Sequence, residues 1–347
     1  MKPVVAIAMS GGIDSLVSAY LLKNKGVKVF GIHFTTGFEP ANAASPASLR
    51  SHLSEQVGIP VHVVDLSRVF RRAVVDYFIR SYREGITPNP CLICNPVVKF
   101  DALFEAAREL GADLLATGHY ARISRQADGP CRLRMGVDRS KDQSYFLSFL
   151  SQGQLSKACF PLGALTKSEV KVFAAERGLT PATLHESQDV CFIQEKNYAD
   201  FLYNYAGLKP MPGPVVTISG EIVGRHNGLH RFTVGQRRGI NCPSSEPYYV
   251  VRLAPSTNTL VVGRKQDLAS EGCTVQSPHW IRPDPSLPLS VKVRLRYRHH
   301  AVPATVTANG DGTLCVSFST PQSATTPGQG AVFYQGDEVV GAGIISS

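Results

Sequence analysis

The feature that most constrains this chain is the segment Ala8-Met9-Ser10-Gly11-Gly12-Ile13-Asp14-Ser15 near its N-terminus. A short apolar run, Val4 to Met9, precedes the turn, and an apolar-periodic run, Leu16 to Leu22, follows it. This order predicts a strand, a glycine-rich turn and a helix. Glycines let backbone N–H groups close around a phosphate, and the N-terminus of the helix adds a favourable dipole.

The polar residues of this turn indicate how it would use a phosphate. Ser10 and Ser15 offer hydroxyl groups, and Asp14 can orient a Mg²⁺ ion or a water molecule. The turn has no lysine where a Walker A loop places one, so it is not the usual cradle for a γ-phosphate. The pattern S-G-G-x-D-S resembles the PP-loop of ATP pyrophosphatases. That resemblance implies a grip on the pyrophosphate end of ATP and transfer of AMP to a substrate oxygen; an ordinary strand-to-helix turn is the plain alternative.

Three of the eight cysteines stand apart from the others. Cys91 and Cys94 form a C-x-x-C pair within Thr87 to Pro96, where three prolines predict a stiff loop and exclude a regular helix or central strand. Cys191 lies in Ser187 to Ile193, which is predicted to be a polar loop leading into a strand. The other cysteines are expected to be reduced core residues, namely Cys131, Cys159, Cys242, Cys273 and Cys315.

The composition is that of a globular protein of 347 residues, without a visible signal peptide or an apolar run long enough to span a bilayer. We therefore expect a cytoplasmic protein that does not bind a membrane. The net charge is +9, and the segment from Arg225 to His300 carries 12 Lys and Arg against 4 Asp and Glu. Such a basic region favours a polyanionic partner, most simply a nucleic acid, although a solvated surface would also account for it.

The pattern along the chain predicts an α/β protein with three domains. Residues 1–205 read as alternating strands and helices, which favours a parallel sheet. Residues 206–272 read as a small β-rich domain and residues 273–347 as a β-barrel, with a break between Ser277 and Pro288. In the run Val291 to Arg298, period-two alternation predicts one apolar face and one face of four cations that repel one another unless a polyanion or solvent lies there.

These parts together suggest that an oxygen of a nucleic acid is activated with AMP and replaced by sulfur. AMP is a good leaving group, and a persulfide or hydrosulfide is a strong nucleophile near neutral pH. The chain resembles the bacterial tRNA-specific 2-thiouridylases along nearly its whole length. The matching segments are Ala8 to Ser15, Thr87 to Phe100, Gly118 to Arg122, Lys141 to Leu147, Ser187 to Ile193, Phe232 to Gly239, Arg296 to Arg298 and Thr326 to Gln329.

The resemblance implies thiolation of the wobble uridine of tRNA with ATP, Mg²⁺ and relayed sulfur. It implies that Ala8 to Ser15 and Gly118 hold ATP, and that Phe34, at a position that is usually Met in the family, contacts adenine. It assigns the persulfide to Cys191 and the assisting thiol to Cys94. The positions matched to the target base and to the rest of the tRNA are Asn89, Pro90, Cys91, His119, Lys141, Asp142, Gln143, Arg296, Tyr297 and Gln329.

One departure from the family pattern opens a second mechanism. Many members carry Asp at the position of Cys91, and here Cys91, Cys94 and Cys191 make three thiols that could hold a [4Fe–4S] cluster with one open iron. The alternative is that Cys91 is a spare thiol beside a persulfide relay. The sulfur donor would be a desulfurase, a sulfur-relay protein or inorganic sulfide. Two other functions remain open at this point: a PP-loop ligase for a small molecule, and an RNA-binding iron–sulfur protein with a vestigial loop.

Overall fold

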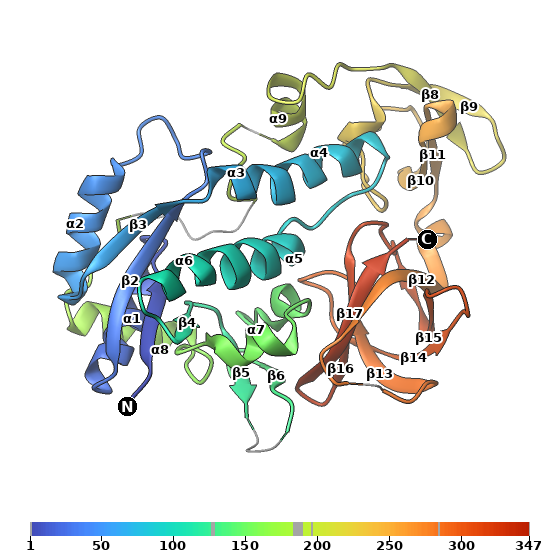
Figure 1. Cartoon of the computed structure of the whole chain (residues 1–347). Coiled ribbons are helices and arrows are strands. Elements are labelled where there is room, and N and C mark those ends of the chain that lie inside the picture. The colour runs from blue at the N-terminus through green and yellow to red at the C-terminus, as the bar shows by residue number, and fades with distance from the viewer. Residues whose placement is uncertain (1, 126–128, 183–189, 196, 284, 347) are drawn as a thin grey trace.

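A five-stranded parallel sheet forms the centre of the N-terminal part of the chain (Figure 1). The computed structural model describes residues 2–125, 129–182, 190–195, 197–283 and 285–346. In the spatial order β3-β2-β1-β4-β7, the strands are β3 (Val61–Asp65), β2 (Lys28–Thr35), β1 (Val4–Ala8), β4 (Leu114–Ala116) and β7 (Ala158–Cys159). The strand order changes direction between β1 and β4, and in open α/β sheets ligands bind outside the carboxyl ends of the strands at such a point.

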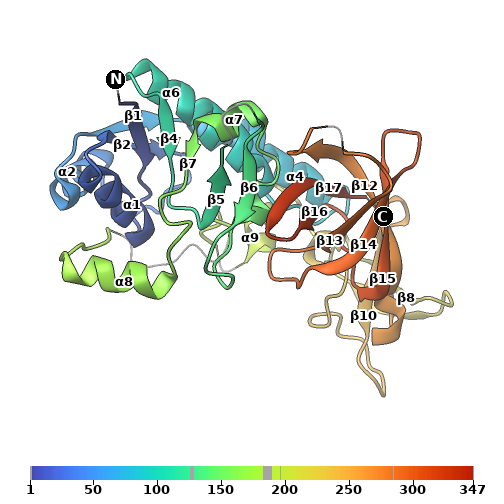
Figure 2. The same cartoon turned by 90° about the horizontal axis from the view of Figure 1, so that it is seen from below.

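Helices cover both faces of this sheet because its strands alternate between two apolar cores. Ala6 of β1 joins one core, and Val5 and Ile7 join the other. Figure 2 shows α1, α2 and α8 on one side of the sheet and α6 and α7 on the other. The α-helices are α1 (Ile13–Asn24), α2 (Pro46–Val57), α3 (Ser67–Phe70), α4 (Asp76–Arg83), α5 (Cys91–Cys94), α6 (Phe104–Glu109), α7 (Gln152–Lys157), α8 (Lys167–Glu176) and α9 (Tyr198–Asn204).

Two wider π-helical turns each join a pair of helices: η1 (Arg71–Val75) joins α3 to α4, and η2 (Asn95–Leu103) joins α5 to α6. Because η2 connects α5 to α6, the helix begins at Cys91, and the predicted loop through Pro96 is wrong from Cys91 onward. Pro96 cannot donate to a carbonyl of the preceding turn. The side chain of Asn95 supplies a replacement, because its Nδ2 donates to the Cys91 carbonyl at 3.0 Å. A shorter 3₁₀ turn, η3 (Ser144–Leu147), follows Gln143.

The middle of the chain forms a small mixed sheet with its own apolar core, as the sequence predicted. Its strands, in the spatial order β10-β11-β8-β9, are β10 (Tyr249–Ala254), β11 (Thr259–Gly263), β8 (Gly213–Thr217) and β9 (Ile222–His226). Short 3₁₀ turns lie beside them, namely η4 (Leu229–Arg231), η5 (Pro255–Thr257) and η6 (Lys265–Leu268). Val215, Val250 and Leu260 are fully buried between these elements.

The C-terminal part closes into a six-stranded barrel, which confirms the predicted fold class. Its strands are β12 (Ala269–Trp280), β13 (Leu289–Arg294), β14 (Val302–Ala308), β15 (Leu314–Ser323), β16 (Gly330–Gln335) and β17 (Glu338–Ile345). Pairing of β12 with β17 closes the ring. The first barrel strand begins at Ala269 and runs to Trp280, so the expected break between Ser277 and Pro288 lies inside the barrel, in the connection from β12 to β13.

The hairpin of β5 (Ala121–Ser124) and β6 (Arg132–Met135) fastens the barrel to the N-terminal part of the chain. It extends the barrel sheet, because β6 pairs with β17 in the register Glu338↔Arg134. Asp337 accepts from Arg122 and from Arg134, each at 2.7 Å. The carboxyl end of β4, which immediately precedes β5, is thereby fixed relative to the barrel.

The predicted row of four cations on one strand face is wrong. The strand β13 ends at Arg294, whose guanidinium is inside the molecule, 3.1 Å from the buried carboxylate of Asp142. Arg296 follows the strand and donates to the carbonyls of Val234 and Ala324. Only Lys292 and Arg298 of the row are exposed, because closure of the barrel turns the other two toward neighbouring segments. None of the helices in the described part of the chain has the length and apolar character that a bilayer crossing requires.

Candidate active site

The glycine-rich turn lies at the carboxyl end of β1 and leads directly into α1. Gly11 has a φ of +86°, in the left-handed region that favours glycine, and Gly12 is the residue before the first turn of α1. The Ser15 hydroxyl is buried and donates to the Gly12 carbonyl at 2.8 Å, whereas Ser10 is exposed. The loop therefore presents Ser10 and the first N–H groups of a 12-residue helix at the edge of the sheet.

A buried cation pairs with the nucleotide loop, which has no lysine of its own. The Nζ of Lys167 lies 2.8 Å from both carboxylate oxygens of Asp14, and the Tyr120 hydroxyl donates to Asp14 Oδ1 at 2.8 Å. Lys167 is the first residue of α8, where the capping box between Thr166 and Glu169 fixes the start of the helix. The Lys167 side chain is only 10% exposed, so this ion pair is shielded from solvent more than a surface pair is.

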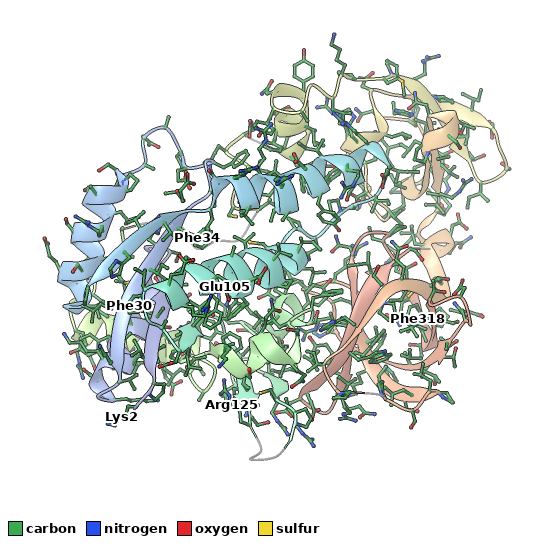
Figure 3. All side chains as sticks on the ribbon, viewed as in Figure 1. Lys2, Phe30, Phe34, Glu105, Arg125 and Phe318 are labelled. Atoms are coloured by element: carbon green, nitrogen blue, oxygen red, sulfur yellow. The ribbon has the colours of Figure 1, made fainter. Side chains whose placement is uncertain are left out.

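Sequence reasoning missed Lys167 and gave no role to Tyr120. Lys167 lies at the start of a helix, but no local pattern places that helix beside Asp14, which is 153 residues away in the chain. Gly118, which was predicted to hold ATP, packs against the same point. A Cβ added there would lie 3.1 Å from the Asp14 carbonyl carbon, so a larger residue would push β4 away from α1. Phe34 lies half-buried near the carboxyl end of β2 (Figure 3).

The three predicted thiols share one electrostatic environment. Cys94 is buried at the end of α5, and burial raises its pKa to about 12. Burial also raises the pKa values of the Cys91 and Cys191 thiols. Lys99 opposes the effect at all three, and the neighbouring thiols raise the pKa of Cys94 further. The thiols are therefore protonated near neutral pH in this arrangement, and Lys99, another residue that the sequence reasoning missed, is the cation that favours their thiolates.

The segment that carries Cys191 differs from its prediction. The N–H of Ile193 donates to the Val190 carbonyl at 3.1 Å, so Cys191 lies in a turn and the predicted strand is wrong. Ser187 to Asp189 of this segment lie outside the described residues. Across the described part of the chain, no three His, Cys, Asp or Glu side chains are arranged to hold a metal ion. In this arrangement Cys91, Cys94 and Cys191 do not fit a preformed iron–sulfur site.

Two of the residues predicted to contact tRNA lie beside the nucleotide loop. The N–H of Tyr120 donates to Gln143 Oε1 at 3.0 Å, and the Gln143 N–H donates to the Tyr120 carbonyl at 2.9 Å. His119 is half-buried against Phe100 and Phe160, and desolvation together with Lys99 holds its pKa well below the ordinary value, so its ring is neutral at pH 7. Tyr120 thus joins Asp14 to the segment that contains Gln143.

The other residues of this predicted set have mixed exposure. Lys141 is half-exposed, and Asp142 is 2% exposed, with its Oδ1 accepting from the N–H groups of Gly136 and Ser144 and its Oδ2 from the Arg294 guanidinium. Tyr297 packs on Phe146 with ring centroids 4.3 Å apart. Asp142 therefore supports the segment from within.

Thr87, just before the thiol segment, is held by three hydrogen bonds from two other parts of the chain. Its N–H donates to the Pro327 carbonyl at 3.1 Å, and its own carbonyl accepts from Gln329 Nε2 at 2.9 Å. Its hydroxyl lies 3.0 Å from that of Thr233 in the middle domain. The segment of Asn89, Pro90 and Cys91 follows at once, and in it Pro90 is buried while the other two residues are half-buried. The structure therefore brings Gln329 of the barrel against the loop that was predicted to meet the target base.

Comparison with known proteins agrees with this architecture. Three family models match the chain: the tRNA methyl transferase HUP domain over residues 3–195, the tRNA methyl transferase PRC-barrel domain over 199–264, and the aminomethyltransferase β-barrel domain over 270–345. A curated relative from Desulfosudis oleivorans, the tRNA-specific 2-thiouridylase MnmA, is 50% identical over 99% of this chain and 95% of its own length. Proteins of the same name from Trichlorobacter lovleyi and Geobacter metallireducens are 46% and 42% identical, each over 99% of this chain and over 97% and 96% of their own lengths.

The fold and the loop define a three-domain PP-loop protein, with a parallel sheet followed by two β-rich domains. At this identity over nearly the full length, the chain belongs to the family of tRNA-specific 2-thiouridylases. The predicted family membership is confirmed, as is the prediction that the chain is an enzyme of this family.

Proposed function

We propose that the chain transfers AMP from ATP to the C2 oxygen of the wobble uridine of tRNA and then replaces that oxygen with sulfur. The observation that carries the proposal is the continuous contact from Lys167 and Asp14 through Tyr120 to Gln143, which joins a nucleotide loop to a segment matched to tRNA contact. The names of relatives that are 50% and 46% identical support the substrate. Because the proposed substrate, tRNA, is found in the cytoplasm, we propose that the reaction takes place there.

At the nucleotide end, the turn from Ala8 to Ser15 would hold the pyrophosphate part of ATP, with Gly118 allowing close approach and Phe34 covering the adenine. Asp14 offers the carboxylate that suits Mg²⁺, and the ion would supply charge neutralisation of the departing pyrophosphate. Lys167, already 2.8 Å from Asp14, brings a second positive charge to the same place. A phosphate that binds here would compete with Asp14 for the Lys167 ammonium, so Lys167 supplies the cation that a Walker A lysine supplies elsewhere.

At the sulfur end, we propose a persulfide relay. The terminal sulfur of a Cys191 persulfide would attack C2 of the adenylated uracil, and the C–O bond would break with AMP as leaving group. The Cys94 thiolate would then attack the Cys191 sulfur, releasing 2-thiouridine and leaving a disulfide between the two cysteines that a dithiol reductant restores. Burial raises the pKa of the Cys94 thiol, and the charge of Lys99 lowers it. Lys99 therefore favours the thiolate form that this role requires.

The tRNA would be held by residues from the first and third domains. Asn89, Pro90 and Cys91 would meet the target base, and His119, Lys141 and Gln143 would contact the RNA beside the nucleotide loop. Asp142 and Arg296 would act by positioning their segments, because both are engaged by other parts of the chain. Tyr297 and Gln329 complete the set. We keep the division into residues 1–205, 206–272 and 273–347 as part of this proposal.

The test is to incubate the protein with ATP, Mg²⁺, a sulfur source and an unmodified tRNA transcript, and to measure 2-thiouridine and pyrophosphate. We expect both products. Absence of 2-thiouridine under aerobic and anaerobic conditions alike would contradict the proposal, and adenylation of a small molecule instead would favour a different ligase.

The colour of protein purified without oxygen distinguishes the persulfide relay from the iron–sulfur alternative. We expect a colourless, active preparation, since the described thiols do not form a ready metal site. A brown protein whose visible absorbance is lost in Cys91→Ala would replace the relay with a cluster on Cys91, Cys94 and Cys191. Cys315→Ala serves as the control, because this half-exposed thiol lies in the barrel strand β15.

A further inference from the structure

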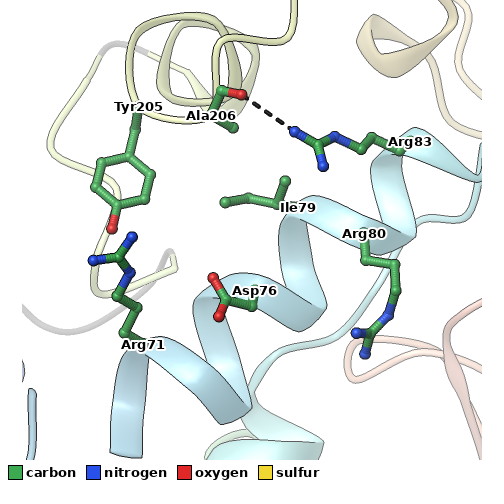
Figure 4. Close-up of a pocket in the computed structure, with 7 residues that line it drawn as sticks. All are labelled: Arg71, Asp76, Ile79, Arg80, Arg83, Tyr205 and Ala206. Atoms are coloured by element: carbon green, nitrogen blue, oxygen red, sulfur yellow. Dashed lines mark hydrogen bonds between the residues drawn. The ribbon is translucent and has the colours of Figure 1, made fainter. Parts of the chain in front are cut away.

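A cationic groove lies between α4 and the end of α9, outside the set of residues predicted from the sequence. Its volume is about 390 Å³, and Figure 4 shows the side chains that surround it. The lining residues are Arg71, Asp76, Ile79, Arg80, Arg83, Tyr205 and Ala206. Three guanidinium groups against one carboxylate leave the groove with a positive charge, and the Tyr205 hydroxyl adds a further hydrogen-bond donor.

Two of the arginines have unused donors. Arg71 and Arg80 are exposed, and within the described part of the chain neither guanidinium makes a hydrogen bond or an ion pair. Arg83 is anchored on the other wall, because it donates to the Ala206 carbonyl at 3.3 Å. Figure 4 shows Arg71 extending toward the Tyr205 hydroxyl and Arg80 on the other side of Asp76. A planar guanidinium with free donors matches the oxygen pairs of a phosphate group.

The groove is part of a longer basic stripe. From Ser67 to Arg83, through α3, η1 and α4, the chain carries five arginines and a single acidic residue, Asp76. Arg68 and Arg72 extend the stripe beyond the groove, and both are exposed. At 1.5 Å per helical residue, Arg68 and Arg83 are about 22 Å apart along the axis. That length exceeds a single nucleotide and suits a polymer with regularly spaced phosphates.

The segments that form both walls of the groove are connected along the chain to the segments that carry the predicted thiols. The chain passes from Arg83 at the end of α4 to Thr87 and the thiol segment within four residues. The other wall, Tyr205 and Ala206, belongs to the segment that follows Cys191, and Tyr205 stacks on Phe201 of α9 with ring centroids 5.1 Å apart. An RNA whose target base reaches the thiols would have its neighbouring backbone near this stripe.

We propose that the groove and its stripe bind the phosphodiester backbone of the tRNA substrate, next to the nucleotide that is modified. This inference rests on the proposed function, because it takes tRNA as the substrate. Arg71 and Arg80 bind phosphate oxygens with their free donors, while Arg83 holds the two walls together. The contact carries no sequence information and strengthens binding of any tRNA that presents its backbone there.

The experiment measures the dissociation constant of an unmodified tRNA transcript as a function of KCl concentration. For the double variant Arg71→Gln, Arg80→Gln, we expect about tenfold weaker binding and a salt slope that is lower by about 2, one for each lost phosphate contact. The rate of thiolation at saturating tRNA should stay near that of the unchanged protein. The charge-preserving variant Arg71→Lys, Arg80→Lys should bind nearly as the unchanged protein does.

A matched control removes two exposed cations elsewhere. Lys28→Gln, Arg50→Gln changes β2 and α2, which Figure 1 shows at the end of the molecule away from α4 and α9, and should leave the salt slope unchanged. An unchanged dissociation constant and slope in Arg71→Gln, Arg80→Gln, with the unchanged protein active on tRNA, would overturn the inference. A second result would also overturn the inference. If the variant lost thiolation with a protein sulfur donor but kept it with inorganic sulfide, the groove would bind the donor and not the tRNA. Failure of the proposed function is a different result, in which the unchanged protein forms no 2-thiouridine.

Discussion

The two ends of the candidate active site differ in how far they are prepared for chemistry. At the nucleotide end, Asp14 already has two partners at 2.8 Å, Lys167 and Tyr120, and the loop geometry is fixed by Gly11 and by the start of α1. At the sulfur end, the thiols are protonated, and Cys94 has its pKa raised to about 12 by burial.

This difference teaches that the two half-reactions have different requirements. The nucleotide loop needs only its ligands, ATP and Mg²⁺, because charges that are already in place act on a developing phosphate charge. The thiols need a change of environment before they can attack, because a protonated thiol is a poor nucleophile. Burial holds Cys94 in its protonated form, and Lys99 is in place to favour the thiolate when it forms.

The strongest way to separate the two ends is to remove a sulfur-carrying thiol. We expect Cys94→Ser and Cys191→Ser each to lower 2-thiouridine formation by at least about 10³-fold, since each loses a nucleophile of the relay. Pyrophosphate release in the presence of tRNA should stay within a few-fold of the unchanged protein. Nucleoside mass spectrometry and a pyrophosphate assay measure the two, with Cys315→Ser as the matched control. Equal loss of both activities would show that the ends are not separable.

The complementary change is made at the nucleotide end. Lys167→Ala should lower pyrophosphate release by about 10²-fold, because it removes a preorganised cation from the site of developing charge. Lys167→Arg should recover part of the rate. The control is Lys171→Ala, which alters an exposed residue one turn further along α8. The rate at which iodoacetamide modifies Cys94 should be unchanged in Lys167→Ala, and a change in that rate would mean that the two ends are coupled.

The protonation state of the sulfur end has its own test. Because the pKa of Cys94 is raised to about 12, its thiolate fraction, and with it the rate of alkylation, should rise about tenfold for each pH unit between about pH 7 and pH 10. Lowering the pH acts in the opposite direction, since it adds protons to the thiol. Lys99→Gln should slow alkylation at every pH by removing the charge that favours the thiolate. A rate that levels off near pH 8 would contradict the burial argument.

The smallest effect is expected at the joint between the barrel and the thiol segment. Gln329→Ala removes the 2.9 Å hydrogen bond to the Thr87 carbonyl, which costs about 1 kcal/mol and should raise the KM for tRNA a few-fold. Steady-state thiolation measures this, and ATP-dependent pyrophosphate release at saturating tRNA should not change. Gln322→Ala is the control, because Gln322 lies on the barrel strand β15 and its Nε2 donates to Thr320 of the same strand. A KM equal to that of the unchanged protein would remove Gln329 from the site.

Local patterns predicted the parts of the site that depend on neighbouring residues. The strand, turn and helix around Ser10 to Ser15 follow from glycine conformation and apolar periodicity, and the fold class follows from how strands and helices alternate. Lys167 could not be found in this way, because its contact with Asp14 spans 153 residues.

The errors have the same physical origin. The apparent cationic face after Val291 fails because the position at which β13 ends, and the buried carboxylate of Asp142 that takes up Arg294, are set by closure of the barrel. The helix at Cys91 was excluded because of three prolines between Thr87 and Pro96, yet a π-helical turn accommodates Pro96, and the Asn95 side chain adds a donor to the Cys91 carbonyl.

The contacts of Thr87 link movements of the two β-rich domains to the position of the thiol segment. Its backbone and hydroxyl are fastened to the barrel and to the middle domain, and Cys91 follows four residues later. A displacement of either β-rich domain therefore shifts the residue from which the thiol segment starts, without any contact to a sulfur atom. A large ligand that moves the barrel or the middle domain would in this way set the position of a small reactive group.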